Sequence, residues 1–189
     1  MIKGIPTFET DRLLLRRIVA EDIHCVYKGL SNPEVVKYYG VSFQSLKATL
    51  KQMDWYEDLE KKGKGQWWAV CARGNKTFYG ACGLNNADHK SKKAQVGFWL
   101  LPLYWGHGIM SEALGPILQF GFMEWSLHRI EAFVEPPNKP CKKVLKKLGF
   151  EHEGTMQKCE VKDGQFIDLE LYAKLKNELE TKRYKSKRG

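Results

Sequence analysis

The first third of the chain places its hydrophobic residues at helical spacing. After a short apolar run at 12–17 that predicts a strand, apolar residues recur every three or four positions from 20 to 30 and predict a helix. Pro33 suits the first turn of a second, short helix, and Ser45 is a favourable N-cap for a longer one that ends near Gly63. We expect the buried side of this longer helix to consist of Leu46, Leu50, Met53 and Leu59.

From residue 66 onward the hydrophobic pattern is that of strands. Three runs at 66–73, 77–84 and 93–101 are separated by short polar turns, so we expect an antiparallel meander. A helix is predicted over 109–125. It contains Pro116, which removes a hydrogen bond and should kink the helix.

The last third alternates the two patterns. A strand is predicted at 129–134, then a helix that starts at 138–140 and ends at Gly149, and then a closing hairpin of 150–159 and 165–174. The alternation predicts an α/β (α+β) fold in a single domain, with a mixed, mostly antiparallel sheet of about seven strands flanked by helices.

The composition supports this interpretation. The 189 residues suffice for one domain with a substantial core, and 43% hydrophobic with 28% charged residues are typical of a soluble globular protein. The longest apolar run, 67–72, is too short to cross a bilayer, and the N-terminus lacks the core of a signal peptide. The five cysteines form no CxxC pair, which favours free thiols over disulfides or zinc. We therefore expect a cytoplasmic protein without a metal and without a membrane partner.

The net charge of +9 is concentrated at one end of the chain. Residues 182–189 contribute five positive charges and no acid, which leaves +4 for the rest. We therefore place the domain at 1–176 and a basic, flexible tail at 177–189. The tail keeps open a contact with RNA or the ribosome, but nucleic acid is otherwise not an expected partner.

Two glycines mark the most informative stretch. Gly106 and Gly108 lie between the third strand of the meander and a helix that begins at Ile109. Glycines let the backbone turn tightly, and the first N–H groups of a helix have no partner within it. The stretch therefore predicts a cradle for a phosphate-bearing ligand at the positive end of the helix dipole. No Gly-Lys-Ser/Thr sequence accompanies it, so the cradle is not a Walker motif.

Further residues at fixed distances extend this motif. Pro102 and Trp105 precede the glycines, Glu112-Ala113 follows them, and Asn138 and Leu148-Gly149-Phe150 come about thirty to forty residues later. Together they resemble the GNAT N-acetyltransferases, and within them the RimJ/RimL branch, whose members acetylate the N-termini of ribosomal proteins. The resemblance runs from about Glu9 to Leu175.

The resemblance implies that acetyl-CoA is the co-substrate and binds in a V-shaped gap between two strands that splay apart. Its pantetheine arm would pair with the strand that ends at Leu100 and Leu101, and its pyrophosphate would lie on the N–H groups of the glycine loop. The expected cofactor-binding residues are Leu100, Leu101, Trp105, Gly106, His107, Gly108, Ile109, Met110 and Asn138. Nearby charges that could balance the phosphates are those of His107, Lys142, Lys143 and Lys146.

The resemblance also implies an acid and a base. The position of a RimL-like serine, the acid for the sulfur of CoA, is Cys141 here, and that of the glutamate base is Glu160. Cys141 lies at a helix N-terminus, which should lower the pKa of its thiol and leaves an acetylated cysteine as an alternative. A tyrosine acid used by other members is replaced by Leu145, and a strand glutamate by Gln95. Water relays therefore remain open.

The acceptor is expected to be a primary amine, foremost the N-terminal α-amine of a protein such as a ribosomal protein. A small amine (polyamine, amino acid or aminoglycoside) is the alternative, and a non-catalytic acyl-CoA-binding module is a third possibility. Tyr38, Tyr39 and Trp55 are candidates for gripping the acceptor, although aromatic residues there also fit a core. The sequence leaves open whether the protein is a monomer or a homodimer.

Overall fold

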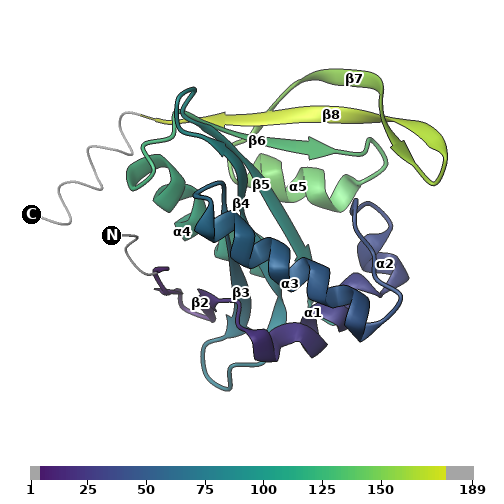
Figure 1. The fold of residues 1–189 in the computed structure, drawn as a ribbon. Coiled ribbons are helices and arrows are strands. Elements are labelled where there is room, and N and C mark those ends of the chain that lie inside the picture. The colour runs from purple at the N-terminus through teal and green to yellow at the C-terminus, as the bar shows by residue number, and fades with distance from the viewer. Residues whose placement is uncertain (1–4, 178–189) are drawn as a thin grey trace, which may run out of the picture.

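The computed structural model describes residues 5–177 and centres on one open sheet of eight strands (Figure 1). The strand order is β1-β2-β3-β4-β5-β6-β8-β7, and all neighbours run antiparallel except β5 and β6, which are parallel. The strands are β1 (Phe8–Glu9), β2 (Leu13–Arg17), β3 (Gln66–Ala72), β4 (Phe78–Asp88), β5 (Lys93–Leu100), β6 (Arg129–Val134), β7 (Glu151–Lys162) and β8 (Gln165–Leu175). The predicted mixed sheet is confirmed. The strand beyond the expected seven is β1, whose two residues are too few to show a period.

Helices cover both faces of the sheet. They are α1 (Ile23–Leu30), α2 (Pro33–Val36), α3 (Leu46–Lys61), α4 (Ile109–Met123) and α5 (Lys139–Lys147), with 3-10 turns at Ala20–Asp22 and Pro102–Tyr104. The buried residues of α1 and α3 pack with one face, and those of α4 and α5 with the other. Two cores therefore lie on opposite sides of the sheet.

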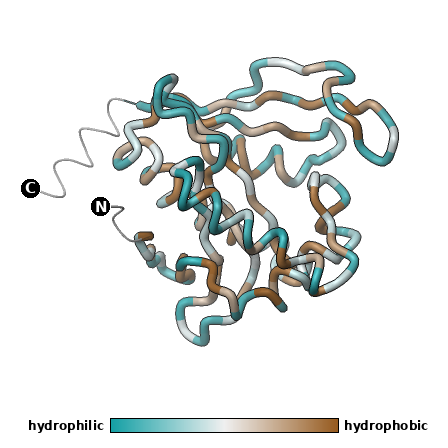
Figure 2. Tube along the Cα trace, viewed as in Figure 1, coloured by the Kyte–Doolittle hydropathy of each residue, from teal (hydrophilic) through white to brown (hydrophobic). Residues whose placement is uncertain are grey.

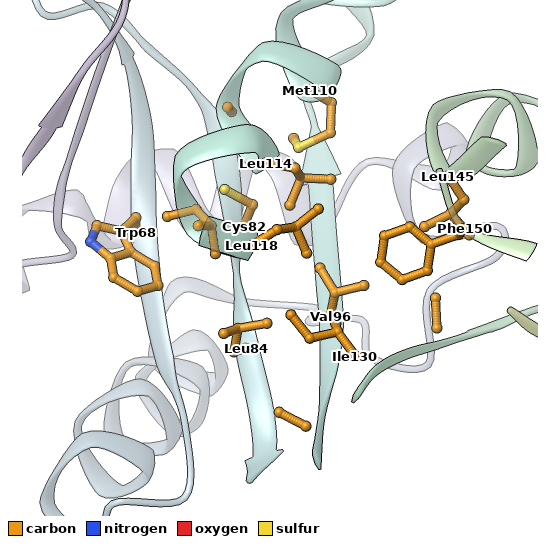
Figure 3. Packing of buried hydrophobic residues seen from close by; sticks show 14 of the residues in the cluster. Trp68, Cys82, Leu84, Val96, Met110, Leu114, Leu118, Ile130, Leu145 and Phe150 are labelled. Carbon is orange, nitrogen blue, oxygen red and sulfur yellow. The ribbon is translucent and has the colours of Figure 1, made fainter. Parts of the chain in front are cut away.

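The core on the α4 side joins this helix to the central strands. Met110, Leu114 and Leu118 of α4 point toward Leu84 of β4 and Val96 of β5 (Figure 3). The helix continues through Pro116. The kink expected there stays a prediction.

The face that α3 buries differs from the prediction. Leu59 is buried as predicted, but Leu50 is 49% exposed, and Thr49, Gln52 and Tyr56 are buried in addition. The opposing sheet surface presents indole rings that carry polar groups, and the Tyr56 hydroxyl accepts a hydrogen bond from Trp99 Nε1 at 3.4 Å. A partly polar face of α3 therefore packs inward, a choice that hydrophobic spacing alone could not reveal.

The predicted helix ends are confirmed by their caps. Ser45 Oγ accepts from the N–H of Ala48 at 3.1 Å, and Asn138 Oδ1 accepts from the N–H of Cys141 at 3.2 Å. Gly149 follows α5 with a φ of 80°. The β3–β4 turn at the bottom of the view is hydrophilic, as expected of an exposed hairpin turn (Figure 2).

All five cysteines are free thiols. Within residues 5–177, no helix is long and apolar enough to cross a membrane. The basic residues 182–189 lie outside the described residues, so the predictions for the tail remain untested.

Candidate functional site

The sheet opens between its two parallel strands. β5 and β6 are paired only from Lys93–Gln95 to Arg129–Glu131, and beyond this point β6 pairs only with β8. We call the space between the diverging ends the β5–β6 gap, and the level of Gln95 and Glu131 its vertex. This arrangement matches the V-shaped opening that the resemblance implied.

The backbone of β5 offers hydrogen-bonding groups to this gap. The N–H of Leu101 donates to Tyr79 O at 2.9 Å, so the backbone groups of Leu101 face β4. Alternate residues of a strand present these groups to opposite sides, and those of Leu100 and Phe98 therefore face the gap. The Leu100 carbonyl accepts from Trp105 Nε1 at 2.7 Å. The N–H of Leu101 is thus already used within the sheet, so the predicted contact of Leu101 with a ligand would have to involve its other atoms. The gap-facing backbone of Phe98 was not predicted, because strand register is invisible in the sequence.

The glycine loop closes the open end of the gap. Gly106 and Gly108 have φ values of 78° and 73°, the left-handed region that the sequence predicted. Gly108 is the N-cap of α4, and its carbonyl accepts from the N–H of Glu112 at 3.1 Å. The N–H groups of Ile109 and Met110 therefore precede the first hydrogen bond of the helix. A Cβ at Gly106 would meet no atom within 4 Å, so the space above the loop is open.

Arg12 anchors this loop, a role that the sequence pattern did not reveal. Its guanidinium donates to His107 O at 3.1 Å and pairs with Glu112 at 2.6 Å. Glu112 also accepts from Thr10 Oγ1 at 2.5 Å. Desolvation acts to raise the pKa of Glu112, but the hydrogen bonds from Thr10 and Arg12 outweigh it and hold the pKa below its usual value. One hundred residues separate these partners, so no local signal could have joined them.

The start of α5 lies directly beyond β6. Asn138 caps the helix, which agrees with a loop-positioning role. Burial raises the pKa of the Cys141 thiol to about 12, so the prediction that the helix N-terminus lowers it is wrong. Leu145 is fully buried in the core. Lys142 is already engaged, because its Nζ donates to Pro136 O and to Glu170 at 2.7 and 3.0 Å.

A cavity of about 460 Å³ opens on the α3 side of the gap. It contains two of the three aromatic residues predicted to grip the acceptor, Tyr39 and Trp55, whereas Tyr38 lies outside it. The lining is Tyr39, Gly40, Val41, Phe43, Lys51, Gln52, Trp55, Trp67, Asn85, Gln95, Val96, Gly97 and Phe133. Lys51 is the only charged side chain among these residues, and none is acidic. The cavity therefore offers no acidic partner to a group with several positive charges.

One wall of the cavity is tied to the β7–β8 hairpin, which curves toward α2 (Figure 1). Lys162 Nζ donates to Lys37 O, pairs with Glu135 at 2.5 Å and lies 5.7 Å from the centre of the Tyr38 ring. The cavity residues 39–43 follow immediately. Glu160 shares this face of β7 with Lys162, two positions earlier, and its side chain is exposed. The structure thus brings Glu160 to the cavity side of the hairpin but not into the lining.

Within residues 5–177, no group of three His, Cys, Asp or Glu side chains could hold a metal ion. The candidate site consists of backbone N–H groups at a glycine loop, a gap between parallel strands and a cavity that has Lys51 as the only charged residue of its lining. These parts suit a phosphate-bearing ligand along one strand and a second molecule without several charges beside it.

Comparison with known proteins identifies this class. The family model for the acetyltransferase (GNAT) domain matches residues 12–151. The uncharacterized N-acetyltransferase p20 of Bacillus licheniformis is 33% identical over 91% of this chain and 97% of its own length. The chain belongs to the GNAT acetyltransferase family and is an N-acetyltransferase.

Two other relatives are named for ribosomal proteins. The ribosomal-protein-serine acetyltransferase of Escherichia coli is 27% identical over 51% of this chain and 54% of its own length. The structure of RimL, a ribosomal L7/L12 α-N-protein acetyltransferase in complex with coenzyme A, superposes with a TM-score of 0.81 at 20% identity, covering 90% of this chain and 98% of RimL. The latter likeness shows the fold, and the two together show that the relatives and structural neighbours of this chain include ribosomal-protein acetyltransferases, in agreement with the resemblance.

Proposed function

We propose that this protein transfers the acetyl group of acetyl-CoA to the N-terminal α-amine of a protein. The observation that carries the proposal is the absence of acidic residues from the lining of the cavity beside the β5–β6 gap. A polyamine or aminoglycoside carries several positive charges and needs acidic partners, but Lys51 is the only charged residue of the lining. A peptide N-terminus presents a single amine, and the amide groups of Gln52, Asn85 and Gln95 suit its polar backbone.

The donor would bind along β5. Its pyrophosphate is placed on the N–H groups of the loop from Gly106 to Met110, at the positive end of α4. From there an extended arm runs back along β5 and meets the gap-facing backbone groups of Leu100 and Phe98. The thioester then lies toward the vertex, where Gln95 and Gly97 line the cavity. Donor and acceptor meet at this point, and placement alone contributes much of the catalysis.

Cys141 acts as a hydrogen-bond donor rather than as an acid that transfers its proton. An ordinary thiol, such as that of CoA, has a pKa near 8.5. Because the pKa of Cys141 is raised to about 12, a proton would move from CoA to a Cys141 thiolate rather than the reverse. Cys141 therefore stays protonated and donates a hydrogen bond to the departing sulfur. The same shift argues against an acetylated cysteine, which requires a thiolate.

The acceptor class is tested with matched peptides. Lysine-containing peptides with a free N-terminus and the same peptides with a blocked N-terminus are incubated with acetyl-CoA, beside spermidine. We expect CoA release and a mass gain at the α-amine for the free peptides only. Turnover of spermidine, or of blocked peptides through lysine, would refute the α-amine proposal. Tight acetyl-CoA binding without turnover of any amine would instead support the non-catalytic alternative.

The α-amine makes only a modest demand on a base. Its pKa is near 8, against about 10.4 for lysine, so a fraction of it is neutral at physiological pH. The predicted base, Glu160, lies on β7, the outermost strand of the sheet, with its side chain exposed. It stays a candidate that acts through water. Because Glu160 lies away from the vertex, a carboxylate closer to the vertex is an alternative base.

A further inference from the structure

A buried carboxylate lies at the vertex of the gap. Glu131 is 9% exposed and is the register partner of Gln95, at the last level where β5 and β6 are paired. Phe133, two residues further along β6, lines the cavity. Because side chains two apart in a strand point to the same face, Glu131 faces the cavity side of the sheet. Glu131 therefore neighbours two residues of the lining, Gln95 across the strand pair and Phe133 along β6, although it is not itself part of the lining.

The charges around Glu131 favour the approach of a positively charged group. Arg129 Nε donates to Glu131 at 2.7 Å, and the other end of the same guanidinium pairs with Glu153 of β7 at 2.5 Å. Two carboxylates thus share one guanidinium, so these three side chains together carry more negative than positive charge. Hydrogen bonds from Arg129 lower the pKa of Glu153, so this carboxyl is ionised at neutral pH.

We propose that Glu131 is the carboxylate that receives the proton of the acceptor amine, an inference that rests on the proposed function. The amine nitrogen bonds to the thioester carbonyl carbon and the carbon–sulfur bond breaks. The proton of the amine passes to Glu131, directly or through one water, and from there to solvent. CoA leaves as a thiolate and takes up a proton from solvent, so atoms and charges balance.

Three features single out Glu131 over Glu160. It is buried, so its charge acts through a medium less polarisable than water. It lies at the level of Gln95, where the thioester arrives, whereas β8 and β7 place Glu160 two strands beyond β6. Arg129 also holds it in a fixed geometry, as general-base catalysis requires.

The shared guanidinium provides a matched control. Glu131→Gln and Glu153→Gln each remove one carboxylate from Arg129 and leave the other, so they disturb the same ion-pair network. With a peptide acceptor, we expect Glu131→Gln to lower kcat about 100-fold or more while the Kd for acetyl-CoA is unchanged. Glu153→Gln should stay within about threefold of the native kcat, and thermal unfolding verifies that both variants are folded.

A rescue measurement separates chemistry from structure. In Glu131→Ala the lost carboxylate leaves space, and added formate should restore turnover in proportion to its concentration. Equal kcat values for Glu131→Gln and Glu153→Gln, or a folded Glu131→Ala that formate does not rescue, would overturn the assignment of Glu131. The proposed function would then still stand, because it fails only if the native protein acetylates no peptide α-amine.

Discussion

Replacing Gly108 with alanine tests the phosphate cradle most directly. The residue has a φ of 73°, where an L-residue costs about 1–2 kcal/mol, which corresponds to a fall in Tm of about 2–8 °C for a domain of this size. The new Cβ would lie 3.8 Å from the nearest protein atom, in the Arg12 guanidinium, so the fold itself tolerates it. It would instead occupy the space through which a phosphate approaches the N–H groups of the loop.

The effect on binding follows from the hydrogen bonds lost. A hydrogen bond to a charged group contributes about 1.5–3 kcal/mol, so losing two of them weakens acetyl-CoA binding by about 10²–10⁴-fold. Gly63→Ala is the matched control, because Gly63 has a φ of 62° and open space around it at the end of α3. Calorimetric titration with acetyl-CoA should show the loss for Gly108→Ala only. Native affinity in Gly108→Ala, or an equal loss in both variants, would refute the cradle.

Further predictions concern the groups around the cradle, the sulfur and the cavity. Cys141→Ser should keep or raise kcat, because a hydroxyl is a stronger hydrogen-bond donor than a thiol. Cys141→Ala should lower kcat by less than about tenfold. A larger loss in steady-state assays would show that Cys141 transfers its proton as an acid. Arg12→Gln should weaken acetyl-CoA binding about two- to fivefold by freeing the loop, since the pair is partly exposed, and native affinity would contradict the anchoring role. The pKa of Glu112 is lowered in the folded state. The support that Glu112 gives to the loop is therefore present above its usual pKa of 4.5 and is lost as the pH falls through the folded-state pKa. Over that range the affinity of the native protein for acetyl-CoA should decline, and the affinity of Glu112→Gln should not. Glu160→Gln should lower kcat less than Glu131→Gln does, and the reverse order would make Glu160 the base.

Much of the fold could be predicted from the sequence because local rules govern it. Helix starts at Ser45 and Asn138 depend on side chains that cap the next turn, and both were predicted. The left-handed glycines of the loop were predicted for the same reason, since only neighbouring atoms decide their φ. The position of the phosphate cradle along the chain therefore follows from local sequence alone.

The remaining parts of the site depend on contacts between distant segments. Register decided that Phe98 rather than Leu101 faces the gap, and packing decided that Thr49 and Gln52, not Leu50, are buried. Burial reversed the expected shift of the Cys141 pKa, because desolvation outweighs a helix terminus.

The sequence by itself determined the family and the position of the glycine loop proposed to hold the donor, since both depend on a contiguous stretch and its flanking residues. Only the tertiary structure decided which residues form the cavity proposed for the acceptor and which carboxylate stands at the vertex. The cavity combines residues from α3, four strands and the segment after α2. Glu131 gains its position from pairing with Gln95, thirty-six residues earlier in the chain. Such proximity arises from the folding of the sheet, and nothing in the local sequence records it.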